Sequence, residues 1–510
     1  MVDAALAAGH RHPECNQPGR TGNDVNRDKQ LEQLVAGHGF PFIPYSPAKS
    51  RARGCTVAAY IPPKPYSLWS VIALARALWR GDGNLLELLP ASAYHFDVGN
   101  LGYSRRSTVL FNDPELVKQI MKDAEGIFPK SDLMVSALEP LIGESIFVTD
   151  GEKWRRQRAM VDPAFSQLRI GHAFTAMRAS VDDYIQRLDA HAESGEAFSL
   201  DLAMSHLTAD IICRTVFSTS LDSRVAMEVF EDFTVFERSV AQVDILRLIL
   251  APAWSEAPQP PAVLEACARI RNHLGTLVDT HLDAAANFND IASAVIDARD
   301  ADTGRGFTRD ELIDQLGVFF LAGHETTASV LTWVFYILGA QPDTLAALRC
   351  EVDSVLGDGE VDFSQLKQLH FTRAIFRETL RLYPPITFMP RVALKPTRIG
   401  PRKLKRGALV MISPWTLHRH SRYWENPHAF MPERFLPENE SALEPGAYIP
   451  FGQGPHTCVG AGFAQAESSL IISRLAGRYD FEILKPDHVR PAARLTTRPA
   501  EQIMCRVRRR

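Results

Sequence analysis

One stretch of about 30 residues, from Thr308 to Gly339, constrains the fold of this chain more than any other part. Thr308 and Glu311 have the spacing of a capping box, and Pro342 follows soon after Gly339. The residues between them are mostly apolar, so the stretch predicts a single helix about 45 Å long at 1.5 Å per residue. A helix of that length can cross a whole domain.

Other segments also repeat apolar residues at helical spacing, and strand-like segments are few and short. The predicted helices are 161–192, 200–217, 262–286 and 344–356, and the predicted strands are 108–111, 409–412 and 503–507. No internal repeat and no second domain boundary is visible. We therefore predict a mainly α protein with small β-sheets, in which one domain spans 41–510 and a disordered leader spans 1–40.

Charge and cysteine usage narrow the possible functions. The chain has 56 Lys and Arg against 60 Asp and Glu, so it lacks the basic field that nucleic acid binding needs. Its seven cysteines include no C-x-x-C pair, which argues against a disulfide framework and a paired-cysteine zinc site. The first apolar stretch, 66–79, contains Arg76 and is shorter than the roughly 20 residues of a bilayer span. We expect a cytoplasmic monomer with no transmembrane segment.

Cys458 differs from the other cysteines in its surroundings. It lies in the sequence FGQGPHTCVG, residues 451–460, directly before an apolar helical run. Glycines permit tight bends, and a helix N-terminus stabilises an anionic sulfur through its dipole and free N–H groups. The alternative is a small buried hydrophobe beside a glycine turn, which suits the other six cysteines. A zinc site at His456 and Cys458 would lack a second pair of ligands.

The long predicted helix carries a polar hexapeptide, residues 322–327, at its centre. Burial of Glu325 is costly unless a partner or water is present. Thr326 can bond back to the carbonyl of Ala322 and open the helix locally, and small residues at 322 and 323 let a flat cofactor approach. A kink satisfied by threonine is the structural alternative. The zinc protease motif H-E-x-x-H is excluded because residue 327 is Thr.

Together these motifs resemble those of the cytochrome P450 enzymes, over roughly residues 55–510. Phe451, Gly454, Cys458 and Gly460 are similar to the family's F-x-x-G-x-x-x-C-x-G loop, and 322–327 is similar to its A/G-G-x-D/E-T-T motif. Trp154 and Arg158 have the W-x-x-x-R spacing, and Glu378 and Arg381 have the E-x-x-R spacing. The resemblance implies the P450 fold, with haem b between the long helix and the cysteine loop.

The resemblance also assigns roles to residues. Cys458 would be the axial ligand of the iron, and Glu325 and Thr326 would be the acid and alcohol that supply protons for oxygen activation. The implied cofactor-binding residues are Trp154, Arg158, Ala322, Gly323, Arg391, Phe451, Gly454, His456 and Gly460. His456 stands where the family usually has Arg, so Arg158 and Arg391 should carry more of the haem binding. Because His titrates near neutrality, we expect haem retention to vary between about pH 6 and 8.

Two further residue sets follow from the resemblance. Glu378 and Arg381 form an i, i+3 pair that any surface helix can carry, but the family implies a buried ion network with Arg434. The implied substrate pocket takes Phe320, Thr327, Ile386, Thr387 and Phe388, together with segments near 130–138 and 495–503. These residues are largely apolar, so we expect a hydrophobic substrate such as a terpenoid. There is a weaker similarity to bacterial gibberellin-pathway diterpenoid oxidases.

The expected activity is a monooxygenation that takes one oxygen atom from O2. No flavin or ferredoxin module is apparent in the sequence, so electrons would come from a separate ferredoxin- or flavodoxin-type carrier. Lys153, Arg155 and Arg156, beside Trp154, are candidates for docking an acidic carrier. The alternatives are a haem-thiolate isomerase or dehydratase and a non-catalytic haem sensor. The Glu325–Thr326 pair argues against both.

Overall fold

The computed structural model describes residues 60–65, 79, 83–101, 105–240, 250, 252–254, 259–283, 288–357 and 359–510. These residues all belong to one unit, Ala59–Arg510. The predicted leader, 1–40, and all of the apolar stretch 66–79 except Trp79 lie outside the described residues.

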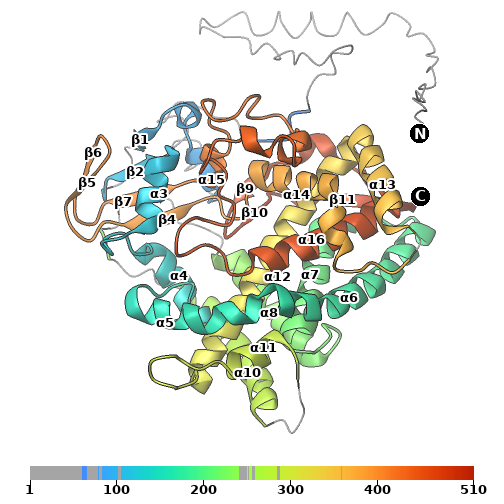
Figure 1. The fold of residues 1–510 in the computed structure, drawn as a ribbon, viewed down its shortest axis with the longest axis horizontal. Coiled ribbons are helices and arrows are strands. Elements are labelled where there is room, and N and C mark those ends of the chain that lie inside the picture. The colour runs from blue at the N-terminus through green and yellow to red at the C-terminus, as the bar shows by residue number, and fades with distance from the viewer. Residues whose placement is uncertain are drawn as a thin grey trace, which may run out of the picture. The chain divides into compact units, whose positions relative to one another are not determined.

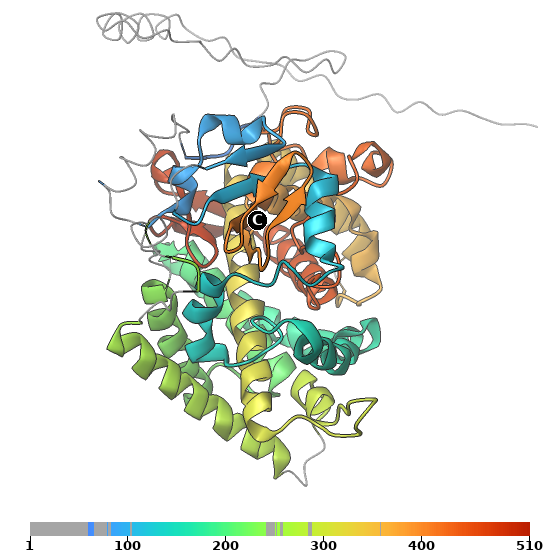
Figure 2. The same ribbon diagram turned by 90° about the vertical axis from the view of Figure 1, so that its left-hand side faces the viewer.

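Helix α12, Arg309–Ala340, is the long helix that the sequence predicts. The capping box forms, because the Thr308 side chain accepts from the Glu311 N–H and the Glu311 side chain accepts from the Thr308 N–H. Figure 2 shows α12, in yellow, running through the middle of the molecule. Helix α7, Leu200–Val216, packs closely along it. A Cβ atom at Gly323 would lie 2.4 Å from the end of the Ile212 side chain of α7, so any larger residue here would force that side chain to move.

Further helices surround α12 (Figure 1). They are α3 (Pro114–Lys122), α4 (Asp132–Ile142), α5 (Gly151–Val161), α6 (Gln167–Ser194), α8 (Arg224–Val240), α10 (Pro261–Leu282), α11 (Ile291–Ile296), α13 (Pro342–Leu356), α14 (His370–Leu382), α15 (Pro414–Leu417) and α16 (Ala461–Ala476). Short 3-10 turns lie at η1 (Leu85–Leu88), η2 (Ala91–Tyr94), η3 (Asp162–Phe165), η4 (Gln365–Gln368), η5 (Pro432–Phe435), η6 (Glu440–Ala442) and η7 (Pro486–His488). No helix of the described residues is both long and apolar enough to cross a bilayer.

The predicted helices are confirmed within a few residues, with one exception. The segment 161–192 was predicted as one helix, but α5 ends at Val161, η3 follows, and α6 begins only at Gln167. Pro163 explains the difference, because proline lacks the N–H that continues a helix and is tolerated only in a first turn.

The strands form four small sheets among the described residues, and Figure 1 shows the sheet of β1, β2, β7 and β4 at the left. The largest has the order β1-β2-β7-β4, namely Val98–Asn100, Thr108–Phe111, Leu409–Ile412 and Met389–Val392. Within it β2 and β7 are parallel, and the other pairs are antiparallel. The remaining sheets are β3-β11-β8 (Phe198–Ser199, Met504–Arg509, Tyr479–Ile483), β5-β6 (Thr397–Ile399, Arg402–Leu404) and β10-β9 (Thr497–Pro499, Pro491–Ala493). The predicted class, mainly α with small sheets, is confirmed.

Candidate active site

A cavity of about 300 Å³ is lined by both α12 and the cysteine loop, residues 451–460. The α12 part of its wall includes the motif residues Ala322, Gly323, Thr326 and Thr327. The cysteine loop contributes Phe451, Gly452, His456, Thr457, Cys458, Val459 and Gly460. The volume is at the lower end of the range, about 300–1,000 Å³, of sites for small molecules and cofactors. The two motifs that the sequence singles out therefore meet at one cavity.

The Cys458 thiol faces this cavity, in contrast to Cys213, Cys267 and Cys505, which are buried in the core. The Cys458 N–H donates to the Phe451 carbonyl at 2.8 Å, which closes the loop. Burial raises the pKa of the thiol, although the Gly460 N–H and the charge of Arg158 act in the opposite direction. The Gly460 N–H and Arg158 therefore favour the thiolate, as expected, but burial has the larger effect on the pKa of the thiol. Coordination to a metal ion would deprotonate the thiol outright.

Gly454 allows the cysteine loop to pack closely against the end of α3. Its φ is +74°, and a Cβ atom there would lie 2.9 Å from the Met121 carbonyl oxygen at the end of α3. Gly454 is absent from the cavity wall. Glycine at this position lets the cysteine loop turn tightly against α3, and the contact of Gly454 with the cofactor stays a prediction.

Cationic and aromatic side chains gather at one end of the cavity wall. Trp154, Arg158, Arg391 and His456 all lie there, as predicted, and Lys130 joins them. The Trp154 and His456 rings pack with their centroids 3.8 Å apart. The Lys130 ammonium donates to the carbonyls of Ile146 and Thr149, and Lys130 forms an isolated β-bridge with Arg391. This end of the cavity suits a ligand that carries carboxylates.

The protonation states of this cluster differ from the expectation. Burial, together with the charges of Lys130, Arg391 and Arg158, lowers the pKa of His456 to about 3. His456 is therefore neutral between pH 6 and 8 in this structure, and it would titrate in that range only if anionic groups of a bound ligand raised its pKa. Burial also lowers the pKa of Lys130, to about 7, with Asp150 opposing and Arg391 adding to the effect. The group that titrates near neutrality is Lys130, which the sequence analysis placed near the substrate pocket.

At the centre of α12 the predicted threonine bond forms. Thr326 Oγ1 donates to the Ala322 carbonyl at 2.7 Å, and Thr326 faces the cavity. The helix nevertheless continues without interruption from Arg309 to Ala340. The side-chain bond competes with the backbone bond at this carbonyl without ending the helix.

Glu325 lies outside the cavity wall, contrary to its predicted place beside Thr326. Its carboxylate forms an ion pair with Arg498, whose Nε lies 2.9 Å from Oε1, and accepts a bond of 2.5 Å from the Thr496 hydroxyl. Burial raises the pKa of Glu325, but the charge and hydrogen bonds of Arg498 outweigh burial and lower it to about 2. Glu325 is therefore an ionised acceptor that holds no proton at neutral pH in this conformation.

The neighbouring His324 extends this charge cluster to α8. His324 Nε2 lies 3.2 Å from Glu237 Oε1, and Nδ1 lies 3.1 Å from the Phe320 carbonyl. Ligand atoms of Glu237, His324 and Glu325 all lie within 4.8 Å of one another. Because the Arg498 guanidinium already neutralises Glu325, we interpret the cluster as an ion network and not as a metal site. Glu237 and Arg498 were not predicted, because no local pattern in the sequence connects them to His324 or Glu325.

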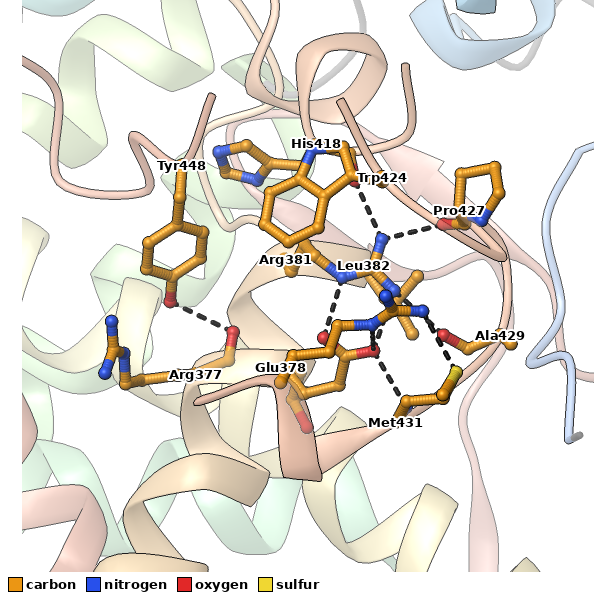
Figure 3. A network of polar contacts seen from close by, with 12 residues as sticks. Arg377, Glu378, Arg381, Leu382, His418, Trp424, Pro427, Ala429, Met431 and Tyr448 are labelled. Atoms are coloured by element: carbon orange, nitrogen blue, oxygen red, sulfur yellow. Dashed lines mark hydrogen bonds and ion pairs between the residues drawn. The ribbon is translucent and has the colours of Figure 1, made fainter. Parts of the chain in front are cut away.

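The predicted scaffold network forms among residues that are not part of the cavity wall, and Figure 3 shows its contacts. Glu378 and Arg381 are fully buried and share two bonds of 2.7 Å. Arg381 also donates to the carbonyls of His418, Pro427 and Ala429 at 2.7–2.8 Å. Arg434 Nε lies 3.6 Å from the Glu378 carboxylate. This network ties α14 to the segment before the cysteine loop.

The predicted substrate residues divide into two groups. Thr327, Ile386 and Phe388 line the cavity, whereas Phe320 and Thr387 do not. Phe320 packs against Phe233 of α8, with ring centroids 4.6 Å apart, and the Thr387 hydroxyl bonds to that of Thr497 at 2.8 Å. Further apolar side chains complete the wall, namely Met134, Ile146, Phe147, Phe165, Val216, Val318, Phe319 and Phe463. Away from its cationic end, the cavity is therefore apolar.

The three cations beside Trp154 are paired within the chain. Arg156 lies 2.7 Å from Glu311, Lys153 forms an ion pair with Glu144, and Arg155 lies 4.0 Å from Glu152. Carboxylates of the protein thus already offset these charges, which weakens their predicted role in docking an acidic electron carrier.

This fold, with a cysteine facing a cavity beneath a long helix, is that of a haem-thiolate protein, and comparisons with known proteins agree. The family model Cytochrome P450 matches residues 62–506. Cyclooctat-9-en-7-ol 5-monooxygenase of Streptomyces melanosporofaciens is 31% identical over 86% of this chain and 92% of its own. Pentalenene oxygenase of Streptomyces avermitilis is 27% identical over 82% of this chain and 91% of its own. The crystal structure of the cytochrome P450DA heme domain superposes with a TM-score of 0.73 at 22% identity, over 89% of this chain and 98% of that one.

The chain belongs to the cytochrome P450 family. It is accordingly an oxidoreductase of the monooxygenase type with a haem-thiolate cofactor. Of the alternatives weighed from the sequence, a non-catalytic sensor and an isomerase or dehydratase are not supported.

Lys130 gives rise to a first prediction. Carboxylates of a bound haem would raise the pKa of Lys130 above its value of about 7, so haem binding takes up a proton whenever Lys130 is neutral beforehand. Haem affinity should therefore be constant below about pH 7 and fall as the pH rises above it. Arginine keeps its charge throughout, so Lys130→Arg should give a flat profile. Transfer of haem to excess apomyoglobin between pH 6 and 9 measures this, and parallel profiles for the two proteins would contradict the prediction.

Proposed function

We propose that this protein binds haem b in the cavity, with Cys458 as the axial ligand, and inserts one oxygen atom of O2 into a hydrophobic terpenoid. One observation carries the proposal: Cys458 and Thr326 line the same cavity, whose wall is apolar except at one cationic end. When bound, the haem supplies the activation of dioxygen, which thiolate ligation favours by donating electron density.

The residues of the cavity suit this cofactor. Ala322 and Gly323 of α12 and Phe451 and Gly460 of the cysteine loop would hold its flat apolar ring. Lys130, Arg158 and Arg391 would hold the two propionates, with Trp154 and His456 as hydrogen-bond donors. Arg158 also donates to the Thr457 carbonyl at 2.6 Å, so it would connect a propionate to the cysteine loop. The cation that His456 does not supply would come from Lys130.

The chain's own residues would control protons and water at the reacting face. Thr326 is bonded to the Ala322 carbonyl, and this bond holds its hydroxyl at the cavity wall, where it can orient a water molecule. The apolar side chains around it limit the amount of water that enters. An ordered hydroxyl in a dry cavity favours proton delivery to the reaction over the release of peroxide.

The apolar wall supports a hydrophobic substrate, and the named relatives support a terpenoid. One relative is named for cyclooctat-9-en-7-ol and the other for pentalenene. A substrate would meet no charged side chain along one part of the wall. That part is formed by Val318, Phe319, Ile386 and Phe388. We infer that electrons arrive from a separate ferredoxin- or flavodoxin-type carrier.

The proposal is tested by turnover with a surrogate ferredoxin and its reductase. The purified protein should consume NADPH and O2 when it is given cyclic diterpene or sesquiterpene alcohols and alkenes, and form products one oxygen atom heavier. Label from 18O2 should appear in the product, and label from water should not. Incorporation from water, or reaction without O2, would contradict monooxygenation.

A second prediction concerns Thr326. Thr326→Val removes the hydroxyl that donates to Ala322 but keeps the side-chain shape, so haem and substrate should still bind. We expect the share of NADPH that yields product to fall about tenfold or more and the share that yields peroxide to rise. Thr332→Val is a matched control, because Thr332 makes the same i−4 bond, to Ala328, outside the cavity wall. Unchanged coupling in Thr326→Val would remove Thr326 from the mechanism.

A further inference from the structure

Residues 496–498 lie at the bend that joins β9 to β10, directly behind the cavity. The resemblance implied that the segment 495–503 lines the substrate pocket, but none of its residues is part of the cavity wall. Thr496 and Thr497 are nevertheless buried, and buried polar groups need hydrogen-bond partners. Their partners belong to two elements that do contribute to the wall, α12 and the segment 384–388.

One stripe of α12 faces these residues. Glu325, Ser329 and Trp333 follow one another at intervals of four residues, so they share a face of the helix. The Ser329 hydroxyl and the Trp333 indole N–H both donate to the Thr497 carbonyl, at 2.8 and 2.7 Å. None of the three stripe residues lines the cavity. The stripe therefore fixes β10 to α12 without taking part in the wall.

Glu325 adds the charged contact of this stripe. Its carboxylate accepts from the Thr496 hydroxyl at 2.5 Å and forms the ion pair with Arg498. Hydrogen bonds between ionised partners are roughly twice as strong as neutral ones. Thr326, the next residue, faces the cavity, about 100° further round the helix. The strongest contact of the stripe is thus adjacent to the hydroxyl at the proposed reacting face.

The opposite side of Thr497 bonds to the segment that carries wall residues. Its N–H donates to the Pro385 carbonyl at 3.0 Å, and its hydroxyl donates to the Pro384 carbonyl at 2.5 Å. Because that bond uses the one hydroxyl proton of Thr497, the Thr387 hydroxyl must be the donor in its 2.8 Å bond to Thr497 Oγ1. Thr497 alone therefore holds the segment at three points.

The side chains of this segment alternate between the cavity and β10. Ile386 and Phe388 line the cavity, whereas Thr387 between them bonds to Thr497. Residues 496–498 thus connect two parts of the wall, the α12 part with Thr326 and the part with Ile386 and Phe388. Hydrogen bonds have a narrow range of lengths, so this connection fixes how far apart the two parts lie.

We propose that residues 496–498 form a positioning bridge, which sets the distance across the cavity between Thr326 and the wall residues Ile386 and Phe388, and that Glu325 anchors this bridge to α12. A substrate held against Ile386 and Phe388 then presents a particular carbon atom to the reacting face, so the bridge determines which position is oxidised. This last consequence rests on the monooxygenase function proposed above, whereas the spacing of the wall does not depend on turnover.

Binding of two imidazoles to the ferric holoenzyme tests the spacing without turnover. Imidazole and 4-phenylimidazole both bind haem iron through nitrogen and shift the Soret band, but the phenyl ring of the second also occupies the cavity. Thr497→Val removes the hydroxyl that links Pro384 to Thr387, and we expect the ratio of the two dissociation constants to change about fivefold or more. Thr497→Ser keeps the hydroxyl and should keep the natural ratio.

A second threonine provides the control for this measurement. Thr332 is also fully buried, but its hydroxyl bonds within α12, to the Ala328 carbonyl, so Thr332→Val should keep the natural ratio. A natural ratio in Thr497→Val would overturn the proposal, and so would an equal change in Thr497→Val and Thr497→Ser.

The anchoring role of Glu325 is tested by a pair of substitutions. An anchor needs both partners, so Glu325→Gln and Arg498→Gln should change the ratio in the same direction. The double variant should change it no more than either single variant, because all three lose the same ion pair. A change in Glu325→Gln without one in Arg498→Gln would show that Glu325 acts alone, and would overturn its role as an anchor.

Turnover of the cyclic terpenes used above extends the test to the oxidised position. Thr497→Val should change the proportions of the oxygenated isomers about threefold or more, and Thr497→Ser should not. Equal proportions in the natural protein and Thr497→Val would contradict the role of the bridge in the reaction. If the natural protein forms no oxygenated product but its imidazole ratio responds to Thr497→Val as expected, the proposed function fails and the bridge stands.

Discussion

Replacing Arg381 with methionine is expected to destabilise the fold by about 3–5 kcal/mol, the largest stability effect that we predict for a single substitution. The change removes the nearer of the two cations of the fully buried Glu378 carboxylate and leaves only Arg434, 3.6 Å away. It also removes the donor to the carbonyls of His418, Pro427 and Ala429. Since folded domains are stable by only about 5–15 kcal/mol, much of the protein should accumulate unfolded or without haem. Urea unfolding followed by circular dichroism measures the loss.

A surface pair provides the matched control for this prediction. Lys395 and Glu125 are 3.0 Å apart but both are more than half exposed, so Lys395→Met should cost no more than about 1 kcal/mol. The double variant Glu378→Leu with Arg381→Met should be more stable than Arg381→Met alone, because the fully buried carboxylate that lost its nearer cation is removed as well. A free energy of unfolding for Arg381→Met within 1 kcal/mol of the natural value would show that the network contributes little.

The main helices could be predicted from the sequence because their signals are local. The capping box at Thr308 and Glu311 and the apolar run after it specify α12 within one residue at each end. The break at Pro163 was missed because apolar spacing continues across it. Strands such as β9 and β10, each of three residues, are too short to show alternation, and a long-range pairing fixes them.

The candidate site was predictable where a motif places a residue on the cavity wall. Cys458, Thr326, Arg158 and Arg391 all lie there. The ion pair of Glu325 could not be predicted, because its partner, Arg498, is 173 residues away and no local pattern connects the two. The protonation states of Lys130 and His456 could not be predicted from the sequence either. They depend on how deeply each side chain is buried and on the charges around it.

Replacing Cys458 with serine is the change expected to affect activity most. Serine keeps the size of the side chain and the N–H bond to the Phe451 carbonyl, so the cysteine loop should keep its conformation. A serine hydroxyl does not ionise at neutral pH to donate electron density as a thiolate does, and we expect no measurable oxygenated product. Cys350→Ser, an exposed cysteine outside the cavity wall, is the control and should retain full turnover. Product formation by Cys458→Ser at a rate near that of the natural protein would exclude a catalytic role for this thiol.

The central claim is that a haem bound in this cavity is ligated by the thiolate of Cys458, and the absorption spectrum of the reduced carbon monoxide complex tests it most directly. The natural protein should show the strongly red-shifted Soret band of thiolate ligation, and Cys458→Ser should bind haem but show the band at the position of a neutral ligand. A natural protein without the red-shifted band, or a Cys458→Ser variant that keeps it, would contradict the claim.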